Sequence, residues 1–98
     1  MNLQFIISPA ARADAMGVQR SLETGSPGAG RRFRDDLEQS WRYIMQFPGG
    51  CRIRYRHYRF MPLGTFNYHV INSISSERII VHSIRHMHQQ PLKHYFGA

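Results

Sequence analysis

The hydrophobic pattern changes its period in the middle of the chain, and this change constrains the fold more than any other feature. Before residues 47–50, which read Phe-Pro-Gly-Gly, apolar side chains recur at the three- and four-residue spacing of one helix face. After this segment the spacing becomes two, which is the period of a half-buried strand. Proline and glycine together favour the end of a helix and a turn. The pattern therefore predicts helices before this segment and strands after it.

The first half also shows where its elements begin and end. Residues 3–7 alternate as a short strand, and Ser8 followed by Pro9 is typical of a helix start. Residues 24–30 are rich in glycine, serine and proline and indicate a turn between two helices. We assign the apolar stripe of each helix to the core rather than to a partner groove. The stripes are Ala11, Ala15, Val18 and Leu22, then Phe33, Leu37, Trp41 and Ile44.

In the second half, strands are predicted in three segments: residues 51–59, 66–74 and 78–84. The last of these has apolar residues at both odd and even positions, as expected for an inner strand that is covered on two sides. The predicted fold is therefore α+β, in the order β-α-α-β-β-β, with a helical hairpin packed on one face of a small antiparallel sheet. At 98 residues the chain has room for one such core, so we expect a single domain, residues 1–98.

The chain is basic, and its charge is unevenly distributed. It holds 13 basic and 6 acidic residues, for a net charge of +7, and every basic residue except Lys93 is arginine. Residues 1–50 contain 6 arginines and 5 acids, whereas residues 51–98 contain 6 arginines, one lysine and a single acid, Glu77. Arginine is preferred where a flat, permanently charged group meets phosphate or carboxylate. The second half is therefore expected to face an anionic partner.

Several functional classes are disfavoured by what the sequence lacks. Cys51 is the only thiol, which excludes a disulfide within the chain and favours a reducing, cytoplasmic location. The first residues read neither as a signal peptide nor as a membrane span. Residues 25–30 lack the preceding strand and the following Lys-Ser/Thr of a phosphate-binding loop. We expect no cofactor and no membrane association.

The densest candidate site is the arginine-rich segment of residues 52–59. On a strand, residues two apart lie on one face, so Arg52, Arg54 and Arg56 are predicted to form a ladder able to follow a polyanion. Tyr55 and Tyr58 supply rings that could stack on bases. Alternating arginines can instead form a solvated face, or protect an edge strand from mispairing. The concentration of charge in this half of the chain favours binding.

The second candidate site lies at the end of the last strand, around Arg85, His86 and His88. Here a histidine can transfer a proton while an arginine neutralises a phosphate. The alternative is a partly buried histidine that holds the strand end to the helices. Six histidines are present, but thiolates and carboxylates are scarce in this half, so we expect no metal site.

With these residues located, the sequence resembles the RelE/ParE superfamily of bacterial toxins, and in particular its ParE branch. Residues 7–11 with Asp14 resemble the opening strand and helix start of that family, and residues 33–48 resemble its second helix and proline turn. Arg59 stands where the family has an arginine before an aromatic strand, here residues 65–70. Residues 78–86 resemble its closing strand and histidine. After that histidine the family usually carries two arginines, where this chain has His88 and Gln89.

The resemblance implies the toxin of a type II toxin-antitoxin, or plasmid stabilisation, system. ParE-like members are implied to inhibit growth by binding DNA gyrase and to be neutralised by a cognate acidic antitoxin, in a toxin-antitoxin hetero-oligomer. The binding residues would be Arg52, Arg54, Arg56, Arg59, Arg85 and His88.

RelE-like members are implied to cut messenger RNA on the ribosome. For that alternative the candidates are Arg59, Arg85, His86, His88 and Tyr95, which match no single catalytic set of the superfamily. Whether the chain is an enzyme is left open. A third possibility is an inactive homologue that only binds its antitoxin.

Overall fold

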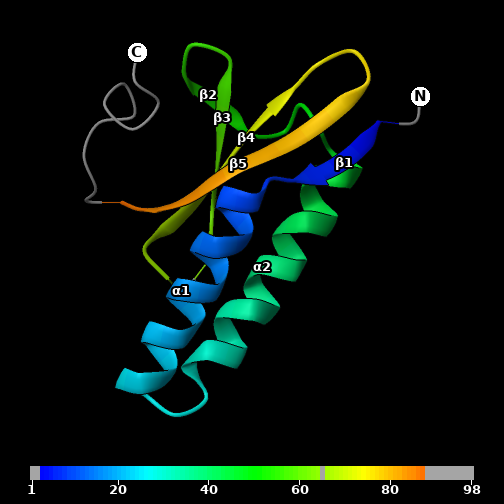
Figure 1. Ribbon diagram of the computed structural model, residues 1–98. Coiled ribbons are helices and arrows are strands. Elements are labelled where there is room, and N and C mark those ends of the chain that lie inside the picture. The colour runs from blue at the N-terminus through cyan, green and yellow to red at the C-terminus, as the bar shows by residue number, and fades with distance from the viewer. Residues whose placement is uncertain (1–2, 65, 88–98) are drawn as a thin grey trace.

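The computed structural model describes residues 3–64 and 66–87. Its elements, in chain order, are β1 (Gln4–Ile7), α1 (Pro9–Gly25), α2 (Ala29–Gln46), β2 (Arg52–Tyr55), β3 (Tyr58–Pro62), β4 (Tyr68–Ile74) and β5 (Arg78–His86). The helices form a hairpin that packs on one face of a five-stranded sheet and projects beyond it (Figure 1). The predicted α+β class and hairpin-on-sheet arrangement are confirmed. Neither described helix is long and apolar enough to cross a membrane.

Helix α1 begins where the sequence predicts. The Ser8 hydroxyl oxygen accepts a hydrogen bond from the Ala11 N–H at 3.0 Å, and Pro9 occupies the first turn, where a missing N–H costs nothing. The Ser8 hydroxyl also donates to the His82 carbonyl at 3.1 Å, and the Ser8 N–H donates to the Val81 carbonyl at 3.0 Å. The start of α1 is therefore attached directly to β5.

The two helices approach closely near the turn that joins them. Gly28 has φ 89°, in the left-handed region that glycine adopts at little cost. At Gly30, a Cβ atom would lie 2.8 Å from the Gln19 carbonyl oxygen of α1, so only glycine allows this contact between the helices. The connection is shorter than predicted, because α1 continues to Gly25 and α2 already begins at Ala29.

The sheet is mixed rather than antiparallel, which corrects the sequence prediction. Its strand order is β1-β5-β4-β3-β2, and β1 runs parallel to β5 while all other neighbours are antiparallel. The alternation of residues 3–7 carries no information on strand direction. In the sequence, the helical hairpin separates β1 from the other strands, and a connection of this length allows β1 to pair with β5 in parallel. The prediction that residues 78–84 form an inner strand is confirmed, because β5 lies between β1 and β4.

The predicted strand of residues 51–59 is two strands, β2 and β3, joined by a tight reversal. The reversal passes through Arg56 and His57, and Arg56 has φ 54°. A left-handed conformation is uncommon for a residue with a side chain and is usually left to glycine or asparagine. The segment contains neither residue type, so its sequence carries no signal for the turn.

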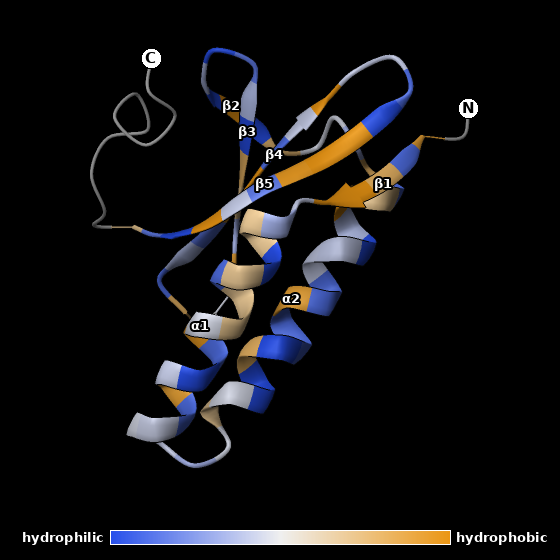
Figure 2. Cartoon of the chain, viewed as in Figure 1, coloured by the Kyte–Doolittle hydropathy of each residue, from blue (hydrophilic) through white to orange (hydrophobic). Residues whose placement is uncertain are grey.

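The core lies between the hairpin and the covered face of the sheet. Phe33 and Ile44 of α2 are completely buried, as are Val70 of β4 and Val81 of β5. The Phe33 ring meets the rings of Phe66 and Tyr68 edge-on, at 5.7 and 5.8 Å. Apolar residues are concentrated on β1 and β5 above the hairpin (Figure 2). The two apolar helix stripes pack in or against this core, as predicted.

Beyond the end of β1, a side chain of α1 forms hydrogen bonds with β5 in place of a neighbouring strand. The Asp14 carboxylate accepts hydrogen bonds from the Ile84 N–H at 3.0 Å and from the Ser83 hydroxyl at 3.1 Å. β1 pairs with β5 only as far as Ile7 and Val81. Asp14 therefore binds a backbone N–H that would otherwise lie at an unpaired strand edge.

We predict that Asp14→Ala lowers the free energy of unfolding by about 1–3 kcal/mol, because two donors lose a charged acceptor. Urea denaturation followed by circular dichroism measures the change. Asp35→Ala, at an exposed position of α2, is the matched control and should change stability by less than about 0.5 kcal/mol. Equal effects of the two substitutions would contradict the assigned role of Asp14.

Candidate functional site

The helices cover one face of the sheet and not the other, and the strand register assigns side chains to each face. Val70 and Ile84 lie opposite each other on β4 and β5 and belong to the core under the helices. Neighbouring side chains on a strand point to opposite faces. His69 and Arg85, which also lie opposite each other, therefore belong to the other side. We call this side the open face because the helices do not cover it, although Ile71 and Arg85 on it are buried.

Two of the predicted arginines lie on the open face of the edge strand β2. Arg52 is opposite Phe60 of β3, which points to this face because its neighbour Met61 pairs with Val70 of the core. The Arg54 guanidinium lies over the Phe60 ring, 5.6 Å from its centre. Both arginines are exposed, and strands β2 to β5 contain no aspartate or glutamate. This edge of the sheet therefore carries positive charge that no strand carboxylate neutralises.

Arg56 is not part of a strand ladder, which corrects the prediction of three aligned arginines. It lies in the reversal between β2 and β3, and its guanidinium is over the Tyr55 ring, 5.3 Å from the ring centre. Its side chain remains exposed. The positive charge therefore continues around the turn rather than along one straight row.

A row of rings extends across the open face from the β2–β3 turn to β5. The rings of Tyr55 and Tyr58 are nearly parallel, with centres 6.5 Å apart. Tyr58 also contacts the rings of His57 and His82, with centres at 4.4 and 5.1 Å. On the β4 side, Ser73 Oγ lies 2.6 Å from His82 Nε2. We call Tyr55, His57, Tyr58 and His82 the ring row.

Two imidazoles of the open face are shifted toward their neutral form. Burial lowers the pKa of His82, and the nearby His57 lowers it further. Burial also lowers the pKa of His69, and Arg54 adds to this effect. A hollow of about 430 Å³ lies beside Arg54 and His69, with Phe60 in its wall. The arginines therefore supply the positive charge around this hollow, and the neutral rings supply contact surface.

Arg59 points away from the open face and holds the connection between α2 and β2. Its Nη1 atom donates to the Cys51 carbonyl at 2.7 Å and, at 3.4 Å, to the Gly49 carbonyl. The Cys51 side chain beside it is buried against Met61, with Sγ and Sδ 3.7 Å apart. Burial raises the pKa of the Cys51 thiol, and Arg59 only partly opposes this shift. Arg59 is thus engaged within the fold.

The group predicted at the end of the last strand is divided between the two faces. Arg85 belongs to the open face, but only 6% of its surface is exposed. His86 lies opposite Tyr68 and meets its ring edge-on at 5.1 Å, while Tyr68 packs against Phe33 of the core. His86 is therefore on the covered side. His88 and Tyr95 lie outside the described residues.

The ribonuclease candidates within residues 3–64 and 66–87 do not form one cluster. Arg59 lies at the α2–β2 connection, Arg85 is buried on the open face, and His86 contacts the core on the covered face. In the same residues, no three side chains of the types that bind metals are grouped closely enough to hold an ion. The described part of the chain therefore keeps Arg59, Arg85 and His86 apart and offers a charged surface with rings.

Two residues of the open face, Phe60 and Ser73, were not predicted from the sequence. Each is one member of an alternating strand, and nothing in its own segment distinguishes it. Phe60 meets Arg54 across one pair of strands, and Ser73 meets His82 across another. The strand register creates both contacts, and a register shift within β4 and β5 helps to set the second.

Comparisons with known proteins bear on the family and the fold. A family model described as the ParE toxin of the type II toxin-antitoxin system parDE matches residues 5–91. Among solved structures, the chain is similar to one described as a chromosomal ParDE toxin-antitoxin system from P. aeruginosa. The TM-score is 0.76 at 14% identity, over 86% of this chain and 95% of that one, which shows a shared fold. No curated protein sequence matches the chain.

We predict that the protein loses stability as the pH falls below about 6.5, the ordinary pKa of histidine. The folded-state pKa values of His69 and His82 are lowered, so the unfolded chain binds protons first. Their contribution is complete above the unfolded pKa and is lost as the pH falls through the folded values. Urea midpoints at about pH 7.5 and pH 5 measure the effect. A double variant, His69→Gln with His82→Gln, should show a smaller change, and an unchanged pH dependence would contradict this assignment.

We also predict that Arg59→Met destabilises the fold by about 1–2 kcal/mol, since two backbone carbonyls lose their donor. Arg56→Met, which removes an exposed guanidinium from the adjacent turn, should cost less than about 0.5 kcal/mol. Urea denaturation distinguishes the two. If Arg59→Met leaves stability unchanged, Arg59 has no structural role and becomes available as a ligand-binding group.

Proposed function

Because the chain belongs to the ParE toxin family of type II toxin-antitoxin systems, we propose that it inhibits growth by binding DNA gyrase rather than by cutting RNA. The observation that carries the proposal is the separation of Arg59, Arg85 and His86 described above. A ribonuclease needs its acid, its base and its phosphate-binding arginine around one reacting phosphate. The described residues instead offer an exposed charged edge suited to protein contact.

The proposed contact surface is the open-face edge with Arg52, Arg54 and Arg56. Arginines and tyrosines are enriched where protein surfaces bind tightly. The rings of Tyr55 and Phe60 lie beneath two of these guanidinium groups and limit their conformational freedom. A surface held in this way loses less side-chain entropy when a partner binds.

We propose that the same edge is neutralised by the antitoxin. Because this edge is positively charged, we expect the antitoxin segment that binds it to be acidic. The hollow beside Arg54 and His69 can receive an apolar side chain of that segment. Such a segment would order as it binds, which lets a short chain cover a large surface. The resulting complex is a toxin-antitoxin hetero-oligomer in which gyrase and antitoxin compete. The proposed site of action is the cytoplasm, where gyrase and its DNA are found.

We predict that the purified protein inhibits DNA supercoiling by gyrase at micromolar concentration. The double variant Arg52→Gln with Arg54→Gln should need about tenfold more protein, because it removes two charges from the proposed contact edge. The matched control, Arg12→Gln with Arg42→Gln, removes the same charge from exposed helix positions and should inhibit nearly as well as the unchanged protein.

The outcome of this experiment also separates the alternatives. Lack of inhibition would overturn the gyrase proposal. Codon-positioned cuts of messenger RNA in a translation reaction would then favour the endoribonuclease. Unimpaired growth on expression without the antitoxin would instead identify an inactive homologue that only binds its partner.

A further inference from the structure

The outer side of β1 is a sheet edge that no described strand covers. β1 stands first in the order of the sheet, and its inner side pairs with β5. The Gln4 N–H donates to the Glu77 carbonyl at 2.9 Å, and the Ser8 N–H donates to a carbonyl of β5 at 3.0 Å. Alternate residues of a strand bond to the same neighbour, so the backbone groups of Phe5 and Ile7 point to the outer side. β1 therefore presents donors and acceptors that β5 does not use.

The two edges of the sheet differ in how they resist pairing with another chain. The opposite edge, β2, carries Arg52 and Arg54, and its register shifts between Ile53 and Tyr55. Charged side chains, an irregular register and a short length are the usual protections of an exposed strand edge. β1 reads Gln-Phe-Ile-Ile and has neither a charged residue nor a register shift. Of these protections it has only its length of four residues, which limits the strength of an association without preventing it.

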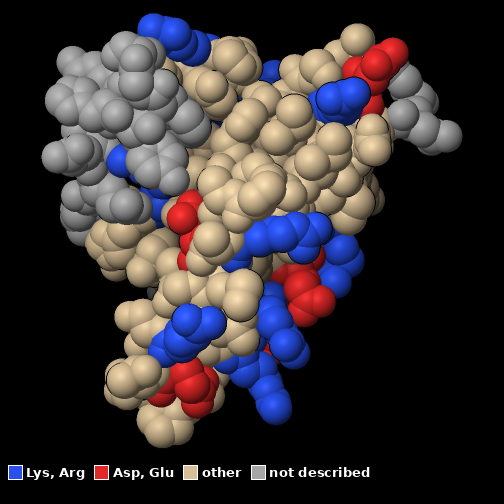
Figure 3. Space-filling view, in the orientation of Figure 1, with Lys and Arg blue, Asp and Glu red and all other residues tan. Residues whose placement is uncertain are grey.

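Apolar side chains of α2 lie beside this edge. The Trp41 ring packs against the Phe5 ring, with the ring centres 5.8 Å apart, and both side chains are only partly buried. Met45 follows Trp41 by one turn on the same side of the helix, and 49% of its surface is exposed. Figure 3 shows a surface without charged side chains where β1 lies, with basic and acidic groups at its borders. A partner at this edge would therefore cover apolar surface as well as pair with the backbone.

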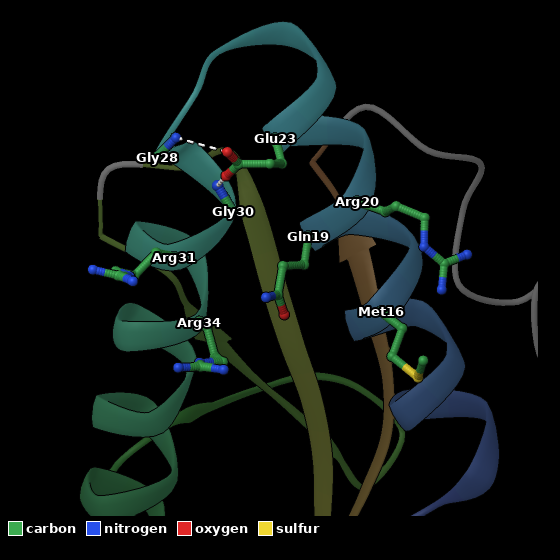
Figure 4. Close-up of a pocket in the computed structure, with 8 residues that line it drawn as sticks. All are labelled: Met16, Gln19, Arg20, Glu23, Gly28, Gly30, Arg31 and Arg34. Carbon is green, nitrogen blue, oxygen red and sulfur yellow. Dashed lines mark hydrogen bonds between the residues drawn. The ribbon is translucent and has the colours of Figure 1, made fainter.

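The hollow of the helical hairpin has no comparable features. Its volume is about 630 Å³, and Figure 4 shows the residues that line it. The Glu23 carboxylate accepts hydrogen bonds from the Gly28 and Gly30 N–H groups at 2.9 and 3.0 Å, so these amides are already used within the turn. Basic and acidic side chains are interspersed along the hairpin (Figure 3). The edge of β1 is thus the stronger candidate for a further contact.

We propose that two copies of this chain associate through β1, antiparallel across a two-fold axis, so that their two sheets join into one. The occupant follows from charge. Each copy carries a net charge of +7, so copies repel each other over most of their surface. β1 is neutral, and a second β1 brings no charge against it. An acidic partner would find no cation on this strand. The proposal goes beyond the proposed function and does not depend on it.

The outward backbone groups determine the register of the pair. A hydrogen-bonded antiparallel pair needs two residues whose backbone groups point toward each other. An axis at Phe5 pairs this residue with its own copy and pairs Leu3 with Ile7 of the second copy, which uses the whole strand. Gln4 then lies opposite Ile6 of the second copy on the open face. An axis perpendicular to the sheet leaves both β2 edges at the outer ends of the joined sheet, where they remain free.

Sedimentation velocity of the full chain tests the proposal. The contact is small, so we expect a reversible dimer with a dissociation constant on the order of 10–100 µM. Raising the salt concentration from about 0.05 to about 0.5 M should tighten the dimer at least about threefold, because salt screens the repulsion between two cationic copies. The same change weakens the binding of an acidic partner, so its direction distinguishes the two kinds of contact.

Two double variants with the same added charge locate the contact. Gln4→Lys with Met45→Lys places lysines at the β1 edge and should weaken the dimer at least about tenfold. The matched control, Gln39→Lys with Met16→Lys, changes the same residue types at exposed positions of the helices and should weaken it about twofold or less. Thermal unfolding by circular dichroism checks that both variants fold. If the first does not, Gln4→Lys alone serves, with a smaller loss expected.

Amide hydrogen exchange identifies the backbone groups involved. Exchange at Phe5 and Ile7 should slow as the protein concentration rises, whereas the Gln4 amide is already bonded within each copy and should change less. A chain that stays monomeric at about 300 µM in high salt would overturn the proposal. Unchanged exchange at Phe5 and Ile7 in a dimer, or equal losses in the two double variants, would place the contact elsewhere. Gyrase and antitoxin are absent, so the result is independent of the supercoiling test.

Discussion

The structure depends on the burial of β5 between two neighbouring strands and the helical hairpin. β1 and β4 pair with its two edges, and Asp14 binds the backbone where β1 ends. Its residues Ile79, Val81 and Ile84 contribute to the core on the covered face. These contacts join the first strand of the chain to its last one. The start of α1 is attached to the same strand, so the direction of the hairpin follows from the position of β5.

This arrangement leaves the arginines in two separate environments. Since both helices pack on one face of the sheet, the charged edge of β2 and the ring row remain on the other. The hairpin projects past the sheet and carries its own arginines away from that edge (Figure 1). The edge of β2 combines charge with rings and a hollow, which suits a polypeptide partner.

Much of the fold was predictable because its signals are local. A helix stripe, a serine before a proline and an apolar strand each depend on a few consecutive residues, and all three predictions were correct. One error arose from strand direction, since β1 is parallel to β5, and another arose where the backbone departs from local preference. Arg56 adopts a left-handed conformation in a turn without glycine or asparagine, so one predicted strand became two. The ladder of three arginines became two on the strand and one in the turn.

Taken alone, the sequence determined the class of fold, the inner position of the last strand, the excess of arginine and the family resemblance. All of these depend on residue type and on spacing along the chain. Only the tertiary structure decided what each polar side chain contacts. Arg59 and Arg85 look alike in sequence to Arg52 and Arg54, yet Arg59 binds backbone carbonyls and Arg85 is buried, whereas the other two are exposed. The reason is that a contact between strands depends on register, direction and face, and none of these is set by a segment in isolation.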